Sequence, residues 1–504
     1  MEIILLSSKK QKSNPFQPGY GVMPPVLAGR SRLKQNFRDR LASIQKRECN
    51  PTAIILVGPR GCGKTALLEW VGREAKSRKL KVVNLVKENF TNLTVLQHAL
   101  NNQASPAGRS RKISVQGRLG EGEASAGIQA EYTHSSSPGT APVQFLGKLL
   151  DIISRKGLIL LVDEAHDMPP EIGKNFYDAA QTIGRSQPLL LVIAGTPDLK
   201  TVLQESHATF SERAQIERIG RLKREEARQA LTEPFDSGIS FHTEALGTVL
   251  AEAQDYPYFI QLWGRALWDV LASSPTHKST NYRVRVEDVA VARDQTVQAR
   301  WELYSNRVQE LSNNNLLVPL AEMAIRLGEE GQPNDFDFEL AIHHLATSAP
   351  STMTYELGSP ARLEAQQTLL HTGFIWEREI GQWEYGIPSL ATHIREEGVR
   401  VVLKTLQGQG TVQALKAVAD CFGSPTNQSM FIETHVLQAA LDRKQLGADD
   451  PLAGFLEMKL LIPARTPSTV RLMAPHLVQA IVAEAKRQNL LPDPGPPARK
   501  AEPS

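Results

Sequence analysis

Glycine, lysine and threonine residues stand together at one point of this chain, in a spacing that suits a triphosphate. Residues 58–65 read GPRGCGKT, after the apolar run IILV and before the helix-forming stretch ALLEWVGREAK. Glycines let a loop curl so that its N–H groups point at phosphate oxygens, and a helix N-terminus adds partial positive charge there. In such a loop Lys64 reaches the β- and γ-phosphates, and the Thr65 hydroxyl binds Mg²⁺. The expected nucleotide-binding residues are Gly58, Pro59, Arg60, Gly61, Cys62, Gly63, Lys64 and Thr65.

A second segment ends in two adjacent carboxylates. Residues 158–167 read LILLVDEAHD, and the five apolar residues fit a central parallel strand that is covered on both faces. Ligands of open parallel sheets lie outside the carboxyl ends of the strands. We therefore expect Asp163 to hold Mg²⁺ and Glu164 to orient or deprotonate the attacking water. The two segments together predict Mg²⁺-dependent hydrolysis of a nucleoside triphosphate.

A simpler interpretation of the acidic pair is that it caps the next helix. That interpretation leaves the phosphate-binding loop, about a hundred residues upstream, without a metal ligand. The two residues that follow, His166 and Asp167, are expected to begin a helix and to take no part in the chemistry.

Composition excludes several other classes of protein. The chain has 504 residues, 41% hydrophobic and 22% charged, which suits two to four ordinary globular domains. Its 57 basic and 54 acidic side chains give a net charge of +3, which neither demands nor excludes a nucleic-acid partner. Its three cysteines are widely spaced, which argues against a disulfide framework and favours a reducing, cytoplasmic location. No apolar run reaches the length of a signal peptide or a membrane span, so no membrane partner is expected.

The order of elements predicts an α/β fold of the P-loop NTPase type, a parallel sheet with a helical lid, followed by mostly helical domains. Strands are expected at 54–57, 80–86, 158–162 and 188–196, alternating with helices. The expected domains, in chain order, are a flexible N-terminal arm (1–25), the α/β core (26–221) with a mobile insertion (104–140), the helical lid (222–275), a helical or winged-helix domain (283–400), a second helical domain that the winged-helix plan also fits (401–490) and a disordered tail (491–504).

The winged-helix expectation comes from one stretch of the later region. Residues 361–372 form an amphipathic pattern, and the following FIWEREIGQWEYGIP alternates around a turn at Ile380 and Gly381. A helix followed by a two-stranded ribbon is the back half of a winged helix. The helix and the ribbon carry few basic groups, and three glutamates surround Arg378. A helix that reads the major groove normally offers more donors than this.

The loop, the DEAH sequence at 163–166 and the strand ending in AGT at 194–196 resemble the AAA+ ATPases. The resemblance is to the branch of bacterial relatives of origin-recognition, transposition-regulator and STAND-type ATPases. It implies ATP as the nucleotide, Mg²⁺ as the metal and assembly into a homo-oligomer. The segment LAGRSRL (27–33) is similar to the box that covers the adenine in this branch.

The same resemblance assigns three further residues. Thr196 occupies the sensor-1 position, Arg213 lies in the segment that carries the arginine finger, and Arg265 matches a sensor-2 arginine of the lid motif YPYFIQLWGRALW (256–268). The sequence departs from the family at Asp255, where a glycine commonly precedes the Tyr-Pro pair.

Each of these three residues also has a simpler structural interpretation. Thr196 also fits a strand-end residue that bonds its own turn, Arg213 a solvated surface charge, and Arg265 a side chain whose stem packs on a neighbouring tryptophan.

The sequence also leaves two classes of function open for such an ATPase. One is a DNA-binding ATPase that uses the winged helix and the basic run 109–112. The other is a STAND-like signalling or defence switch whose C-terminal domains bind a protein partner.

Overall fold

The computed structural model describes residues 13–19, 22–49, 52–104, 157–206, 212–235, 238–273, 282–313, 316–332, 374–379, 381–406, 411–422, 431–442, 454–456, 460–463 and 469–491, with single residues at 336, 337, 341, 363, 366, 367, 369, 370 and 458. Our expectations for the insertion 104–140, the basic run 109–112, most of the helix 361–372 and the tail lie outside these residues. The chain divides into two compact units, Met1–Ala292 and Arg293–Ser504, which we describe separately.

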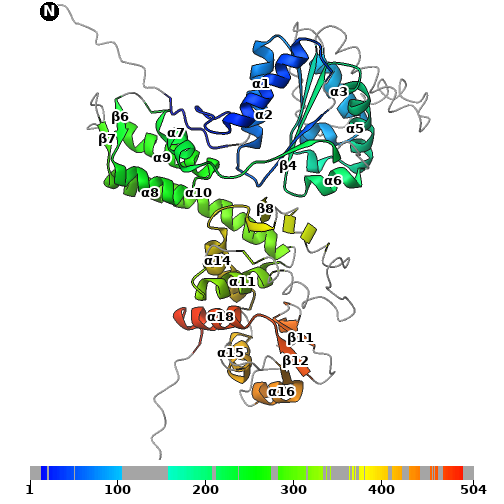
Figure 1. Ribbon diagram of the computed structural model, residues 1–504. Coiled ribbons are helices and arrows are strands. Elements are labelled where there is room, and N and C mark those ends of the chain that lie inside the picture. Colours follow the sequence, from blue (N-terminus) through cyan, green and yellow to red (C-terminus); the bar gives the residue numbers. More distant parts are fainter. Residues whose placement is uncertain are drawn as a thin grey trace, which may run out of the picture. The chain divides into compact units, whose positions relative to one another are not determined.

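A five-stranded parallel sheet forms the centre of the first unit (Figure 1). Its strands stand in the order β2-β3-β4-β1-β5. Their bounds are β1 Ile54–Val57, β2 Lys81–Leu85, β3 Leu158–Val162, β4 Leu189–Gly195 and β5 Gln215–Arg218. The predicted P-loop NTPase fold is therefore confirmed, and β3 is buried along its whole length. Strand β5 was not predicted, because an edge strand with the sequence QIER has no apolar run to signal it.

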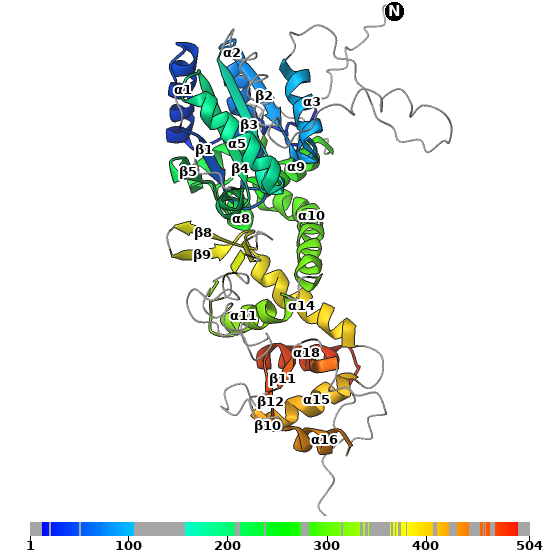
Figure 2. The ribbon, with the colours of Figure 1, turned by 90° about the vertical axis from the view of Figure 1, so that its right-hand side faces the viewer.

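Helices cover both faces of this sheet, as Figures 1 and 2 show. Alternate strand residues point to opposite faces, so each strand contributes apolar side chains to both layers. Residues such as Val83, Leu160 and Leu191 form one core cluster with residues of the helices on that side. On the other face α2 lies so close that a Cβ on Gly72 would be 3.3 Å from Leu161. The helices that follow or precede the strands are α1 Ser31–Gln45, α2 Lys64–Ser77, α3 Leu93–Ala104, α5 Pro170–Gly184 and α6 Leu199–Glu205, with short 3₁₀ turns η1 Lys87–Phe90 and η2 Ala165–Asp167.

Three helices form a lid after the sheet. They are α7 Arg224–Thr232, α8 Thr243–Ala253 and α9 Pro257–Ser273, with a parallel strand pair, β6 Ile239–Phe241 and β7 Tyr282–Val284. Part of the N-terminal arm packs on this lid: Phe16 is buried against Phe235, with ring centroids 5.2 Å apart. The side-chain nitrogen of Asn14 donates to the Arg265 carbonyl (3.1 Å) and to Asp269 Oδ1 (2.8 Å).

The second unit is mostly helical, as predicted. Helix α10 Val286–Asn313 runs through the boundary between the units. An antiparallel hairpin and a three-stranded sheet of order β10-β12-β11 complete the unit. Its other elements are α11 Leu317–Glu329, β8 Ile375–Glu379, β9 Gln382–Tyr385, α14 Leu390–Leu406, α15 Thr411–Phe422, β10 Phe431–Glu433, α16 Thr434–Asp442, β11 Leu461–Pro463, β12 Thr469–Leu472 and α18 Pro475–Arg487. No helix in the described part of the chain is both long and apolar enough to span a bilayer.

A buried carboxylate joins two helices of the second unit. Glu322 of α11 accepts hydrogen bonds from the backbone N–H groups of His476 (3.2 Å) and Leu477 (2.7 Å), at the start of α18. The same carboxylate lies 2.7 Å from His476 Nδ1. Glu322 therefore caps α18 from another helix, and its charge suits the positive end of the helix dipole.

This pair predicts a pH dependence of stability. The hydrogen bond that His476 makes to the Glu322 carboxylate raises the pKa of His476 above its usual value. A raised pKa in the folded state means that the stabilisation is complete below the unfolded pKa, about 6.5, and is lost as pH rises through the folded value. We expect the melting temperature of the second unit to fall as the pH rises above about 6.5, and this fall to shrink in His476→Gln. A matched control is Glu329→Gln, because that carboxylate is exposed and 3.7 Å from the ring. Equal pH profiles in all three proteins would contradict the assignment.

Candidate nucleotide-binding site

The GPRGCGKT loop connects the carboxyl end of β1 to the N-terminus of α2. Gly61 and Gly63 have φ values of +83° and +91°, a conformation that side chains with a Cβ rarely adopt. A Cβ on Gly58 would lie 2.0 Å from the carbonyl oxygen of Ile219, just after β5. Glycine is thus required at these three positions by backbone conformation or by close packing.

Lys64 is almost completely buried within the loop. Its side chain donates from Nζ to the carbonyl oxygens of Gly58 (2.8 Å) and Pro59 (2.9 Å). A buried ammonium is costly without partners, and here the loop's own carbonyls supply them. The structure therefore places one positive charge inside the predicted phosphate-binding loop.

The two predicted metal ligands lie side by side. The Thr65 hydroxyl hydrogen-bonds the carboxylate of Asp163, which follows β3 directly. Burial raises the pKa of Asp163, and the bonds from Thr65 and from the Glu164 N–H (3.0 Å) partly offset that effect. A hydroxyl and a carboxylate are hard oxygen donors of the type that Mg²⁺ takes. The residues present fit that ion.

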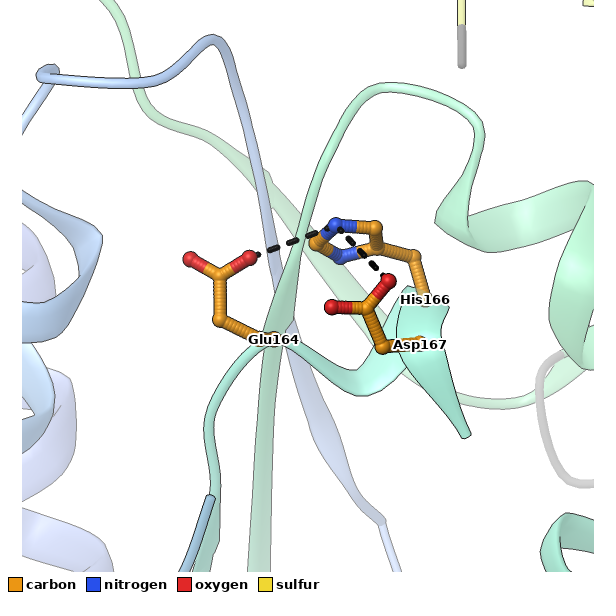
Figure 3. Close-up of side chains that lie close together, drawn as sticks. All are labelled: Glu164, His166 and Asp167. Carbon is orange, nitrogen blue, oxygen red and sulfur yellow. Dashed lines mark ion pairs between the residues drawn. The ribbon is translucent and has the colours of Figure 1, made fainter. Parts of the chain in front are cut away.

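Glu164 lies at the rim of the site and contacts a buried histidine (Figure 3). Its backbone is left-handed (φ 51°), and its side chain is 41% exposed. The Nε2 atom of His166 is 3.2 Å from Glu164 Oε2, and only 3% of the histidine side chain is exposed. At this distance the two groups are in contact, although they do not form an aligned hydrogen bond. His166 does lie in the expected helical turn, η2, but the sequence analysis missed its contact with Glu164.

Glu164, His166 and Asp167 are close enough together to suggest a second cation site. The hydrogen bonding argues against it. The backbone N–H of Thr196 donates to His166 Nδ1 (3.4 Å), so the neutral ring carries its proton on Nε2 and faces the carboxylates as a donor. Asp167 is in turn paired with the ammonium of Lys87 (2.8 Å). We therefore assign no metal to this cluster.

Arg30 is a site residue that the sequence analysis did not single out. It lies just before α1, and its Nη2 donates to the carbonyl oxygens of Cys62 (2.5 Å) in the loop and Gly220 (3.2 Å) after β5. Burial lowers the pKa of this guanidinium, while the Cys62 thiol and the Glu226 carboxylate oppose that shift. The signal for it in the sequence is the Gly-Arg pair in LAGRSRL, which the family resemblance connects with the adenine and the structure connects with the loop backbone.

The lid also contacts the loop. The Tyr256 hydroxyl donates to the Arg60 carbonyl, and the Tyr258 N–H donates to the Gly61 carbonyl (3.2 Å). Asp255, where the family commonly has glycine, has a φ of 55°, which explains that preference. Its carboxylate pairs with Arg224 at 3.3 Å.

The three residues assigned by resemblance lie in different surroundings. Thr196, just after β4, is 1% exposed, and its hydroxyl donates to Asp198. Arg213 is exposed and precedes β5, at the end of that strand away from the loop. Arg265 is exposed on α9, about two turns beyond Tyr258. The structure thus brings the loop, Asp163 and Glu164 together and keeps Arg213 apart from them.

A comparison with protein families places these elements. The family model described as an AAA domain matches residues 47–203, which include the loop, both carboxylates and the end of β4. This segment is an AAA domain. The chain is accordingly a P-loop ATPase, and its AAA domain holds all the residues of the predicted phosphate and metal site.

Comparisons with individual proteins give weaker similarities. No curated protein matches the chain. A Walker-type ATPase of Pyrococcus abyssi is 16% identical, with a TM-score of 0.45 over 72% of this chain and 95% of that chain. The ORC2 protein of Aeropyrum pernix is 12% identical, with a TM-score of 0.45 over 78% and 98%. The RuvB branch-migration motor of Thermotoga maritima is 13% identical, with a TM-score of 0.37 over 71% and 92%.

The contacts of Arg30 predict that it supports the loop. Arg30→Ala leaves two carbonyls of the site without their donor, so we expect a loss of about 1–3 kcal/mol in stability and weaker ATP binding. Arg30→Lys should rescue little, because the shorter lysine side chain does not bring its ammonium to the position of Nη2, between the two carbonyls. Thermal melts and titration with a fluorescent ATP analogue measure both effects. Arg32→Ala is the control, since Arg32 is exposed; identical behaviour of the two alanine variants would refute the role.

Proposed function

We propose that this chain is a Mg²⁺-dependent ATPase in which Lys64 and the loop bind the triphosphate, Thr65 and Asp163 hold the metal, and Glu164 activates water. The observation that supports the proposal is the hydrogen bond between the Thr65 hydroxyl and the Asp163 carboxylate, beside the buried Lys64 ammonium. One cation and one pair of oxygen ligands stand at the carboxyl ends of β1 and β3, which is where ligands of such sheets bind.

The chemistry follows from the charges of these residues. Phosphate oxygens would replace the Gly58 and Pro59 carbonyls as partners of Lys64, so the ammonium exchanges neutral acceptors for charged ones. A bound Mg²⁺ neutralises charge that develops on the phosphates. The half-exposed Glu164 carboxylate is within reach of solvent, as a base that takes a proton from water must be.

Two substitutions test this assignment. Lys64→Ala should abolish ATP binding, because it removes the buried positive charge. Glu164→Gln should bind MgATP normally and lower the turnover by about 10²-fold or more, because an amide cannot accept the proton. Calorimetry and phosphate release measure binding and turnover separately. Retained affinity in Lys64→Ala, or normal turnover in Glu164→Gln, would overturn the corresponding role.

We further propose that the second unit binds DNA through winged-helix domains at 283–400 and 401–490. The order of the sheet in the second of these domains supports this: β10 is followed by α16, then by β11 and β12, and β12 lies between the other two strands. A helix, a strand, a helix and a two-stranded ribbon in this arrangement suit a winged helix.

A protein partner is the second candidate, and one observation favours it. The β8–β9 hairpin carries Glu377, Glu379 and Glu384 with a single arginine, Arg378. Two of these carboxylates bind the hairpin itself, Glu384 to the Trp376 Nε1–H (2.9 Å) and Glu377 to the Gly381 N–H (2.9 Å). Three carboxylates on one hairpin repel phosphate, so this element suits the STAND-like alternative.

A salt titration separates the two candidates. If the chain neutralises about three phosphates, its affinity for an arbitrary duplex with ATP present should fall roughly 40-fold between about 50 and 200 mM salt. Fluorescence anisotropy of a labelled duplex measures this slope. Binding that is absent or insensitive to salt would remove the DNA proposal and leave the protein partner.

A further inference from the structure

We propose that His166 is a positioning residue for hydrolysis: it holds the Glu164 carboxylate and ties its place to the end of β4 at Thr196. The inference rests on the proposed role of Glu164 as the base, and it adds to that role the residue that orients it. Figure 3 shows the ring of His166 between the η2 turn and the Glu164 side chain.

The imidazole is fixed at one nitrogen and available at the other. The Thr196 N–H donates to Nδ1 (3.4 Å), and only 3% of the side chain is exposed. Thr196 belongs to a rigid turn, because its carbonyl accepts the Leu199 N–H (3.0 Å) and its hydroxyl donates to Asp198. The position of the ring is therefore set by the end of β4. Its Nε2 atom faces the Glu164 carboxylate and lies 3.2 Å from Oε2.

The electrostatics of the pocket keep this contact a neutral one. Burial lowers the pKa of His166, and this outweighs the opposing effects of Glu164, Asp167 and Asp198; Lys64 acts in the same direction as burial. A neutral N–H donor orients a carboxylate and withdraws much less of its basicity than a full positive charge would. Such a partner suits a group that must still accept a proton.

The two carboxylate oxygens of Glu164 would then have separate tasks. Oε2 would stay beside the His166 Nε2–H, which lies 3.2 Å away, throughout the reaction. Oε1 accepts a proton from the attacking water as the water oxygen bonds to the γ-phosphorus, and the bond from that phosphorus to the β,γ-bridging oxygen breaks, with ADP as the leaving group. His166 gains and loses no proton. Its contribution is to fix the direction in which Oε1 points.

Substitutions that keep or remove an N–H donor at the position of Nε2 test the inference. Gln places an amide N–H near the position of Nε2, whereas Asn and Ala do not reach Glu164. We expect kcat to fall about 10-fold in His166→Ala and His166→Asn, with the MgATP dissociation constant unchanged, and to recover largely in His166→Gln. Lys87→Ala is the matched control, because Lys87 is an exposed partner of Asp167 in the same cluster, and its kcat should change less than about twofold.

A double-mutant cycle separates a positioning role from a structural one. In a Glu164→Gln background the loss caused by His166→Ala should disappear, because the group that it positions no longer acts as a base. An unchanged kcat in His166→Ala, a loss that persists in the Glu164→Gln background, or a weakened MgATP affinity would each overturn the inference. If Glu164→Gln alone retains full turnover, the proposed function fails first, and the two failures are thereby distinguished.

Discussion

The GPRGCGKT loop of the first unit is organised around one buried ammonium. The Nζ atom of Lys64 is held by the carbonyls of Gly58 and Pro59, inside a loop that curls only because Gly61 and Gly63 take positive φ angles. A buried charge tolerates little loosening of its partners, because each lost hydrogen bond leaves it uncompensated. The loop must therefore be held in place by its surroundings, and neighbouring segments do so through hydrogen bonds to its carbonyl groups.

These hydrogen bonds come from parts of the chain that are far apart in sequence. Arg30 joins the Cys62 carbonyl to Gly220, across separations of 32 and 190 residues. The lid adds the Tyr256 hydroxyl, which donates to Arg60 over 196 residues. All three contacts use carbonyl oxygens of the loop or of the segment after β5. The N-terminal segment, the lid and the sheet are thus coupled through the predicted phosphate-binding loop.

The parts that the sequence predicted correctly are those with local signals. Strands β1, β3 and β4 are marked by apolar runs, and the loop is marked by the spacing of its glycines. Each of these signals is contained in about ten consecutive residues. Arg30 and His166 could not be recognised in this way, because a single polar residue acquires its role from partners that the fold brings to it. Strand β5 was missed for a related reason: an edge strand is half exposed, and its alternation over four residues is too short to be distinctive.

The position of Arg213 decides whether it can act on the nucleotide site of its own chain or on that of another copy. Strand β5 runs parallel to β1, with Gln215 opposite Ile54 and Arg218 opposite Val57, so Arg213 precedes the end of the sheet that lies opposite the loop. An arginine there does not reach the loop of its own chain. It is exposed beside a strand that pairs only with β1 among the described strands. If Arg213 stabilises transition-state charge, as the family resemblance implies, that charge belongs to a neighbouring copy, and hydrolysis is then linked to assembly.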